Sequence, residues 1–509
     1  NDGMVHIFKK NGGSDERSYN LKLSYIPGTM PRKDIESNDS TLAKELRAFA
    51  EKGYVGDRYG VDGGFVLRRI TDDQDRQKHF FMFGAMGLGG RGAYALDLSK
   101  INGNYPAAAP LFDVKDGDNN GKNRVEVKLG YTVGTPQIGK TQNGTYSAFL
   151  ASGYAAKKID DSTNKTALYV YDLKDTLGTP IAKIEAPGGK GGLSSPTLVD
   201  KDLDGTVDIA YAGDRGGNMY RFDLSNSDSS KWSAKVIFEG DKPITSAPAV
   251  SRLADKRVVI FGTGSDLSEE DVVDTKEQYI YGIFDDDKPT VNVKVTNGTG
   301  GGLLEQNLTQ ENKTLFLTNN KASGGSADKG WVVKLREGER VTVKPTVVLR
   351  TAFVTIRKYN DDGCGAETAI LGINTADGGA LTPRSARPIV PDHDSVAQYS
   401  GHKKTADGKS VPIGCMWKNG KTVCPNGYVY DKPVNVRYLD EKKTDDFPVT
   451  ADGDAGGSGT FKEGKKPARN NRCFSGKGVR TLLMNDLDSL DITGPMCGIK
   501  RLSWREVFF

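Results

Sequence analysis

The sequence predicts an all-β fold of the β-propeller class, with long inserted loops and one short helix. Two observations support this prediction. The chain of 509 residues contains 62 glycines while only 36% of its residues are hydrophobic, and two short strand-like elements recur along it. Many short strands joined by tight turns need glycine at the turns and contain few long apolar runs. A chain of this length holds either several ordinary domains or one large domain built from repeats.

The first recurring element is a pair of small residues and a proline, followed by alternating apolar residues. Its prolines lie 60 and 52 residues apart, at Pro136, Pro196 and Pro248. The second element is an aromatic strand that follows a glycine-rich turn and ends near an aspartate. Its copies are 92–97, 168–172, 219–223 and 279–285, with weaker copies at 4–8 and 369–374. A loose period near 50 is typical of propeller blades of the kelch or quinoprotein type. A β-sandwich with repeated hairpins is the alternative.

Several stretches interrupt these repeats. Ser37–Ala50 is the best helical candidate, because Leu42, Leu46 and Phe49 fall on one helix face. Insertions are expected near 27–60, 289–329 and 382–475, and the last two are rich in Gly, Asn, Lys and Thr. We therefore expect residues 1–509 to form one propeller domain that carries these insertions. The chain opens on a turn that runs directly into a strand, so we expect it to belong to a longer protein whose N-terminal domain is absent.

The strongest chemical signature is an aspartate-rich loop at residues 200–208. Acidic residues occupy its positions 1, 3, 5 and 9, which are Asp200, Asp202, Asp204 and Asp208. Gly205 at position 6 allows a sharp turn, and Thr206 at position 7 is expected to offer its backbone carbonyl. Calcium is a hard cation that takes six to eight oxygen ligands, and this spacing directs oxygens to one centre. The sequence therefore predicts Ca²⁺ as the cofactor of this loop.

The flanks of the loop distinguish it from a helix–loop–helix calcium sensor. Position 12 is Tyr211, where such a sensor has a glutamate. Residues 198–199 before the loop and 209–212 after it have the apolar composition of strands. We therefore expect a shortened calcium loop between two strands, with Asp208 supplying the closing carboxylate.

A second, weaker metal site is conceivable at Asp116, Asp118 and Asn120, with Gly121 at the sixth position. Its ninth position is Arg124, which would place a positive charge beside the metal. An ordinary turn is therefore favoured at this position.

The five cysteines all lie in the C-terminal third of the chain. A two-residue turn centred on Asn419-Gly420 would pair Cys415 with Cys424 at a non-hydrogen-bonded position of a hairpin. Opposed Cα atoms come within about 4.5 Å at such a position, which is inside the range of a disulfide. A disulfide would indicate an oxidising compartment, and free thiols are the alternative. Cys473 and Cys497 would then pair most simply, leaving Cys364, although sequence does not fix the connectivity.

Charge and motif content argue against several function classes. The net charge is only +4, from 70 basic and 66 acidic residues, so the overall electrostatic field does not indicate a nucleic-acid partner. No stretch approaches the roughly 18–20 apolar residues of a membrane span. The glycine-rich segment 87–92 precedes a strand rather than the helix that a dinucleotide-binding loop requires. No zinc-site spacing or nucleophile elbow occurs, so we expect a protein that is not an enzyme.

Segments scattered along the whole chain carry a family resemblance, namely 1–8, 87–97, 198–223, 330–331, 338–340 and 502–506. They resemble the C-terminal domain of the PilC/PilY family of type IV pilus proteins, and their sequences are most similar to the neisserial PilC members. The resemblance implies a modified, quinoprotein-like propeller with seven blades. It also implies calcium binding by Asp200, Asp202, Asp204, Thr206 and Asp208.

The same resemblance implies a role in pilus biogenesis that opposes retraction, together with a contribution to host-cell adhesion. The implied partners are pilin or minor pilins, pilus assembly proteins and a host-cell receptor. The implied location is the cell surface, outer membrane or pilus tip, reached through the periplasm. Two alternatives stay open: a lectin-like or receptor-binding propeller acting through the C-terminal insertions, and a quinoprotein-class enzyme.

Overall fold

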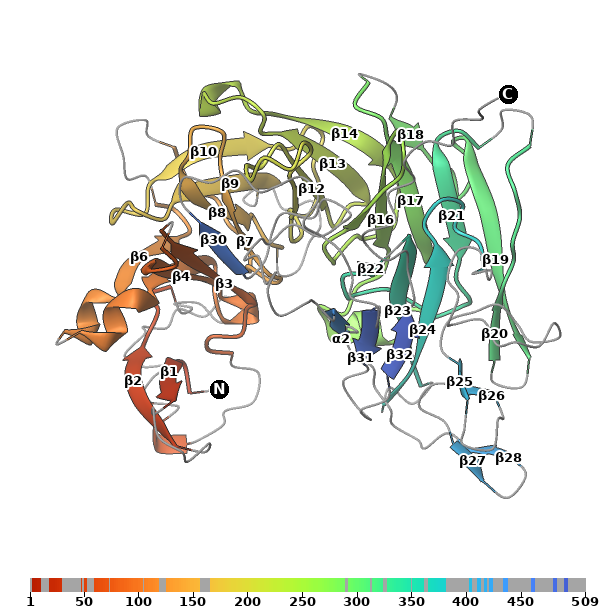
Figure 1. The fold of residues 1–509 in the computed structure, drawn as a ribbon. Coiled ribbons are helices and arrows are strands. Elements are labelled where there is room, and N and C mark those ends of the chain that lie inside the picture. Colours follow the sequence, from red (N-terminus) through yellow and green to blue (C-terminus); the bar gives the residue numbers. More distant parts are fainter. Residues whose placement is uncertain are drawn as a thin grey trace, which may run out of the picture.

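The protein is almost entirely β-structure (Figure 1). The computed structural model describes residues 2–10, 18–29, 47, 50–52, 59–72, 74–103, 105–118, 125–155, 165–288, 292–311, 314–323, 327–348, 350–360 and 365–380, together with the backbone of eight short strands beyond residue 400. The described helical segments are short: α2 (Glu269–Val272), the 3-10 helices η1 (Gly87–Gly89), η2 (Leu98–Asn102), η3 (Pro106–Ala108) and η4 (Ser229–Lys231), and helical positions at 47 and 50–52.

Four sheets form the first half of the fold, and each contains a set of four neighbouring antiparallel strands that we number as a blade. The first blade is β3 (Phe65–Thr71), β4 (Gln77–Ala85), β5 (Gly92–Asp97) and β6 (Pro110–Lys115). The second is β7 (Gln137–Lys140), β8 (Tyr146–Ala151), β9 (Ala167–Asp172) and β10 (Pro180–Glu185). The third is β11 (Thr197–Val199), β12 (Ile209–Gly213), β13 (Asn218–Asp223) and β14 (Ser233–Glu239). The fourth is β15 (Ala249–Arg252), β16 (Arg257–Gly262), β17 (Tyr279–Asp285) and β21 (Gly330–Lys334).

A fifth blade is the three-stranded sheet β22 (Thr346–Val348), β23 (Thr351–Tyr359) and β24 (Ala366–Asn374). The blades follow one another in an arc from the first, in red and orange, to the fifth, in green and blue-green (Figure 1). A further three-stranded sheet contains β29 (Val434–Arg437), β31 (Val479–Leu482) and β32 (Ser489–Ile492). The all-β, propeller-like fold is confirmed, and the count of seven blades stays a prediction.

Both repeated sequence elements have fixed places in a blade. The proline elements precede the first strands β7, β11 and β15, where the missing N–H of proline costs no ladder bond. Thr135 N donates to Ser195 Oγ at 2.9 Å, and Thr197 Oγ1 donates to the Pro248 carbonyl at 2.5 Å. Neighbouring copies of the element therefore lie side by side.

The aromatic elements are the third strands β5, β9, β13 and β17. Each ends at an aspartate whose Oδ1 accepts the backbone N–H two residues later, as Asp97 does from Ser99 at 3.1 Å. The corresponding hydrogen-bonded pairs in the other three strands are Asp172 with Lys174, Asp223 with Ser225, and Asp285 with Asp287. This aspartate turn ends the strand and starts the connection, which explains why aspartate recurs there.

The core consists of apolar layers between successive blades. Tyr169 and Tyr171 of β9 pack toward the first blade, while Leu168 and Val170 of the same strand pack toward the third. This follows from the two-residue period of a strand, because the third strand of an inner blade is covered on both faces. A fully buried leucine or valine contributes roughly 1.5–3 kcal/mol by leaving water. The stability of each blade therefore depends on both of its neighbours.

Additional strands extend several blades. The expected insertion at 289–329 is more regular than its sequence indicates: β18 (Val293–Lys294) pairs with β14, and β19 (Leu303–Glu311) pairs with β21 and with β20 (Thr314–Leu317). From the C-terminal region, β30 (Gly459–Lys462) pairs in parallel with β3 of the first blade. Segments far apart in the sequence are thereby joined in one sheet.

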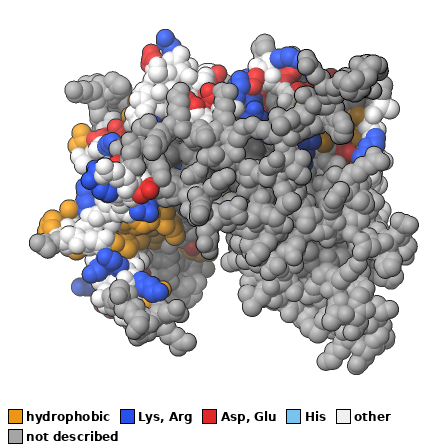
Figure 2. All heavy atoms as spheres, in the orientation of Figure 1, with side chains coloured by type: hydrophobic (Ala, Val, Ile, Leu, Met, Phe, Trp, Pro, Cys, Tyr) orange, Lys and Arg blue, Asp and Glu red, His pale blue; other side chains and the backbone are white. Residues whose placement is uncertain are grey.

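The N-terminal strands β1 (Val5–Lys10) and β2 (Tyr19–Tyr25) form a separate antiparallel ribbon. Val5, Ile7 and Leu23 pack against the first blade, whereas Phe8 and Leu21 are exposed. On the face shown in Figure 2, apolar side chains gather near the first blade, and acidic and basic side chains are mixed over the remaining described surface. This mixture agrees with the small net charge.

Other sequence expectations have specific outcomes. The segment 87–92 forms η1 and then enters β5, as expected for a blade turn. Beyond residue 400, β25 (His402–Lys404) pairs with β26 (Ser410–Pro412), and β27 (Met416–Lys418) pairs with β28 (Lys421–Val423) in the predicted hairpin register. The four cysteines of the expected disulfides, Cys415, Cys424, Cys473 and Cys497, lie outside the described residues, as do Cys364 and most of the expected helix at 37–50.

Candidate metal centre

The aspartate loop lies in the third blade, between β11 and β12, with strands on both sides as the sequence predicts. The Asp208 N–H donates to the Val199 carbonyl at 2.9 Å and closes the base of the loop. Leu203 has φ 63° and Gly205 has φ 95°, so the backbone turns through the left-handed region twice. Glycine adopts this conformation readily, and the loop curls tightly at its centre.

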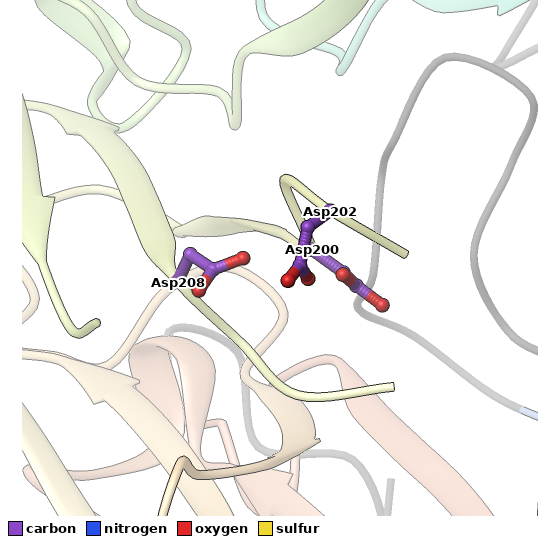
Figure 3. Close-up of side chains that lie close together, drawn as sticks. All are labelled: Asp200, Asp202 and Asp208. Carbon is purple, nitrogen blue, oxygen red and sulfur yellow. The ribbon is translucent and has the colours of Figure 1, made fainter. Parts of the chain in front are cut away.

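Three carboxylates converge inside the curl. Ligand oxygens of Asp200, Asp202 and Asp208 all lie within 4.8 Å of one another. Asp200 is only 1% exposed and Asp208 is 9% exposed. Figure 3 shows Asp200 and Asp208 approaching each other from the two ends of the loop, with Asp202 beside Asp200. Among the described residues, this is the one acidic group whose geometry could hold a metal ion.

Backbone amides hold the two buried carboxylates in place. Asp200 accepts hydrogen bonds from Asp204 N at 3.1 Å and from Gly205 N at 2.8 Å. Asp208 accepts one from Lys201 N at 2.7 Å. The loop therefore folds around its own carboxylates, which fixes their orientation before any ligand arrives.

The electrostatics of the loop favour a cation. Burial, and then the charges of Asp208 and Asp204, raise the pKa of Asp200 from 3.8 to about 7. Burial, and then the charges of Asp202 and Asp204, raise the pKa of Asp208 to about 6. Hydrogen bonds from backbone amides offset only part of these effects. Without a positive charge, the ionised forms of Asp200 and Asp208 are thus less favourable than those of ordinary aspartates.

The sequence signature of the PilY1 β-propeller domain matches residues 1–321. The chain belongs to the PilY1 β-propeller family. The type IV pilus biogenesis factor PilY1 of Pseudomonas aeruginosa is 27% identical over 436 residues, which cover 74% of this chain and 34% of that protein. A PilY1 homolog of Xylella fastidiosa is 27% identical over 294 residues, covering 56% of this chain and 21% of that protein. The chain therefore spans about a third or less of the length of these curated relatives.

A solved structure supports the fold of this PilY1-family chain. The C-terminal domain of Pseudomonas aeruginosa PilY1 superposes with a TM-score of 0.59 at 19% sequence identity. The superposition covers 97% of this chain and 93% of that structure. At this level of identity the similarity demonstrates a common fold.

One of the expected acidic ligands, Asp204, lies outside the group of three converging carboxylates. Its Oδ1 accepts hydrogen bonds from Thr206 N at 2.8 Å and from Thr206 Oγ1 at 2.6 Å. In this arrangement Asp204 stabilises the turn, and it contributes to the site through its charge.

At the second candidate site, backbone amides donate hydrogen bonds to both described carboxylates. Asp116 Oδ1 accepts from Leu129 N at 2.8 Å, and Asp118 Oδ2 accepts from Lys115 N at 3.1 Å. Asn120 and Arg124 lie outside the described residues. The first contact joins two segments of the chain and the second is local, and the second metal site stays a prediction.

Contacts from neighbouring blades were not foreseen from the sequence. Gln142 Nε2 of the second blade donates to Asp208 Oδ1 at 2.8 Å. From the fourth blade, Asp287 pairs with the ammonium group of Lys201 at 3.0 Å. Neither residue belongs to a recognisable motif, and only the packing of blades brings them to the loop.

The described part of the chain contains no helix with the length and apolar character of a transmembrane span.

Proposed function

We propose that this chain is a calcium-binding, non-enzymatic module of a type IV pilus-associated protein. The observation that carries the proposal is the convergence of Asp200, Asp202 and Asp208 in a tightly curled loop of a PilY1-family propeller. Asp204 and the backbone carbonyl of Thr206 are proposed as further oxygen donors. The domain is proposed to extend over residues 1–509, with insertions near 27–60, 289–329 and 382–475.

The donor set suits calcium better than a softer metal. The three converging side chains are all carboxylates, and neither histidine nor cysteine is among them. Hard cations prefer oxygen ligands, and calcium tolerates the irregular geometry of a short loop. Bound calcium would supply the positive charge that the buried carboxylates lack.

The site is suited to controlling shape rather than performing a reaction. Asp200 directly follows β11 and Asp208 directly precedes β12, so an ion between them would tie two strands of one blade together. Calcium would thereby stabilise the blade and the surfaces next to it. This supports a structural or regulatory role in preference to catalysis.

The relatives indicate the process in which the module acts. Their names describe type IV pilus biogenesis factors, from Pseudomonas aeruginosa and from Xylella fastidiosa. We propose that this chain supports pilus biogenesis by opposing retraction and contributes to host-cell adhesion. Its proposed partners are pilin or minor pilins and pilus assembly proteins, at the cell surface, outer membrane or pilus tip.

The proposed assembly function is tested by pull-down of pilin and minor pilins with the purified chain, in calcium and in EDTA. We expect a pilus component to be retained, and to be retained more strongly in calcium. Asp200→Asn gives the matched control, since it should behave in calcium as the wild type does in EDTA. Retention of no pilus component under either condition would overturn the proposed partner class.

A further inference from the structure

Asp208 receives a hydrogen bond from outside its own blade. The Nε2 amide of Gln142, in the turn between β7 and β8 of the second blade, donates to Asp208 Oδ1 at 2.8 Å. We propose that Gln142 is a positioning residue for calcium, which holds the Asp208 carboxylate in the orientation that the ion requires. The proposal rests on the proposed calcium function and adds a contribution from the neighbouring blade.

The turn that carries Gln142 is closed by its own hydrogen bonds. Thr141 N donates to the Thr145 carbonyl at 2.9 Å. Asn143 Oδ1 accepts from Thr141 Oγ1 at 2.6 Å and from Thr145 N at 3.1 Å. The backbone on both sides of Gln142 is therefore fixed, and its amide is presented to the loop without much freedom.

The second blade also contacts the loop through its backbone. Val207 N donates to the Lys140 carbonyl at 2.8 Å. A Cβ on Gly139 would meet Val207 Cγ2 at 2.5 Å and Leu198 Cδ1 at 3.1 Å. The second blade therefore approaches the loop as closely as glycine allows, which sets the distance between Gln142 and Asp208.

The contacts leave Asp208 able to bind a cation. Its Oδ1 accepts from Gln142 and its Oδ2 accepts from Lys201 N at 2.7 Å. A carboxylate offers about four lone-pair positions on its two oxygens. Both oxygens therefore retain acceptor capacity while the group is held from two directions. Groups that orient a metal ligand in this way typically change metal affinity by about 10–100-fold when they are removed.

The test compares two replacements of Gln142 in the purified 509-residue chain. Gln142→Met keeps the length of the side chain and removes the donor, whereas Gln142→Ala removes both. Gln74→Ala, which truncates an exposed glutamine of the first blade, is the control. Calcium affinity is measured by isothermal titration calorimetry, and the melting temperature of each calcium-free protein is measured separately.

We expect both Gln142 variants to bind calcium about 10-fold more weakly or worse, with the calcium-free melting temperature close to that of the wild type. Gln74→Ala should bind as the wild type does. If Gln142→Met keeps wild-type affinity, packing rather than the donor is responsible and the proposal is wrong. If the wild type binds calcium and both Gln142 variants bind it with the same affinity, this inference alone is overturned. A wild type that binds no calcium would overturn the proposed function as well.

Discussion

Lys201 Nζ lies 3.0 Å from Asp287 Oδ2, and this ion pair joins the aspartate loop of the third blade to the end of β17 in the fourth. Asp287 Oδ1 also accepts hydrogen bonds from Arg221 and from Arg257, which are 11% and 10% exposed at their side chains. Burial raises the pKa of Asp287, but hydrogen bonds from Lys201 and Arg257 outweigh this effect and hold that pKa below its ordinary value. Asp287 thus connects the loop to a largely buried ionic network.

Replacing Asp287 should destabilise the junction between these blades. Asp287→Ala leaves the guanidinium of Arg257 with fewer partners in a buried setting, so we expect a loss of about 3 kcal/mol in unfolding free energy. Lys201→Ala removes the more exposed end of the pair and should cost at most about 1 kcal/mol. Asp286→Ala, next in sequence and exposed, is the control and should change little. Equal effects of Asp286→Ala and Asp287→Ala in urea unfolding would contradict this account.

The calcium-free protein should lose stability as the pH rises from about 4 to about 7. The pKa of Asp200 is raised in the folded state to about 7, so the folded protein binds its proton more tightly than the unfolded chain does. A raised pKa stabilises the fold below the unfolded value and loses this contribution as the pH passes the folded value. Urea unfolding in EDTA across this range measures the trend. A calcium-free stability that rises steadily over the same range would argue against a buried, uncompensated carboxylate.

Calcium affinity should increase between about pH 5 and about pH 8, as Asp200 and Asp208 lose their protons. Protons and calcium compete for Asp200 and for Asp208, whose pKa is about 6. Binding at pH 5 must therefore displace protons that are absent at pH 8. Calorimetric titrations at the two pH values measure the difference, and equal affinities would exclude these two carboxylates as ligands.

Removing one converging carboxylate should weaken binding strongly. Asp200→Asn preserves the size of the side chain and removes a charged ligand, so we expect affinity to fall by about 100-fold. Asp116→Asn at the second candidate site is the control, because Asp116 is not among the three converging carboxylates and its Oδ1 accepts a hydrogen bond from Leu129 N. Direct calcium titration distinguishes the two positions. A larger loss of calcium affinity in Asp116→Asn than in Asp200→Asn would indicate that calcium binds at the Asp116 loop instead.

Gly139 should tolerate no larger side chain. A Cβ there would lie 2.5 Å from Val207 Cγ2, so Gly139→Ala should cost about 1–3 kcal/mol through overpacking between two blades. The control is Gly103→Ala, where the nearest atom to a Cβ would be the carbonyl oxygen of Lys100 at 3.5 Å. Thermal unfolding compares the two variants, and similar melting temperatures would show that the blades can separate at this point without cost.

The sequence predicted the features that repeat. The proline before each first strand and the aspartate after each third strand have local causes, namely the missing N–H of proline and the aspartate turn. They could therefore be recognised at Pro136 and Asp172 without knowing how the blades pack. The tight loop between two strands at 200–208 could be predicted for the same reason, because its spacing lies within nine residues, and its binding of calcium stays a prediction.

The contacts between blades could not be predicted in this way. Gln142 lies 66 residues before its partner Asp208 in the sequence. Asp287 lies 86 residues after its partner Lys201. Such contacts depend on how neighbouring sheets pack, which one-dimensional spacing does not encode. The extra strands at 293–317 were missed because their sequence lacks sustained alternation, and pairing with existing sheet edges supplies the order instead.

Thermal unfolding of the wild-type chain in calcium and in EDTA tests the central claim most directly. Calcium at 100 times its dissociation constant should stabilise the folded protein by about 2.7 kcal/mol, because it binds the folded loop and not the unfolded chain. We predict a higher melting temperature in calcium for the wild type and only a small part of this increase for Asp200→Asn, because a 100-fold weaker site is about half occupied at the same calcium concentration. Identical melting temperatures of the wild type in calcium and in EDTA would contradict the account.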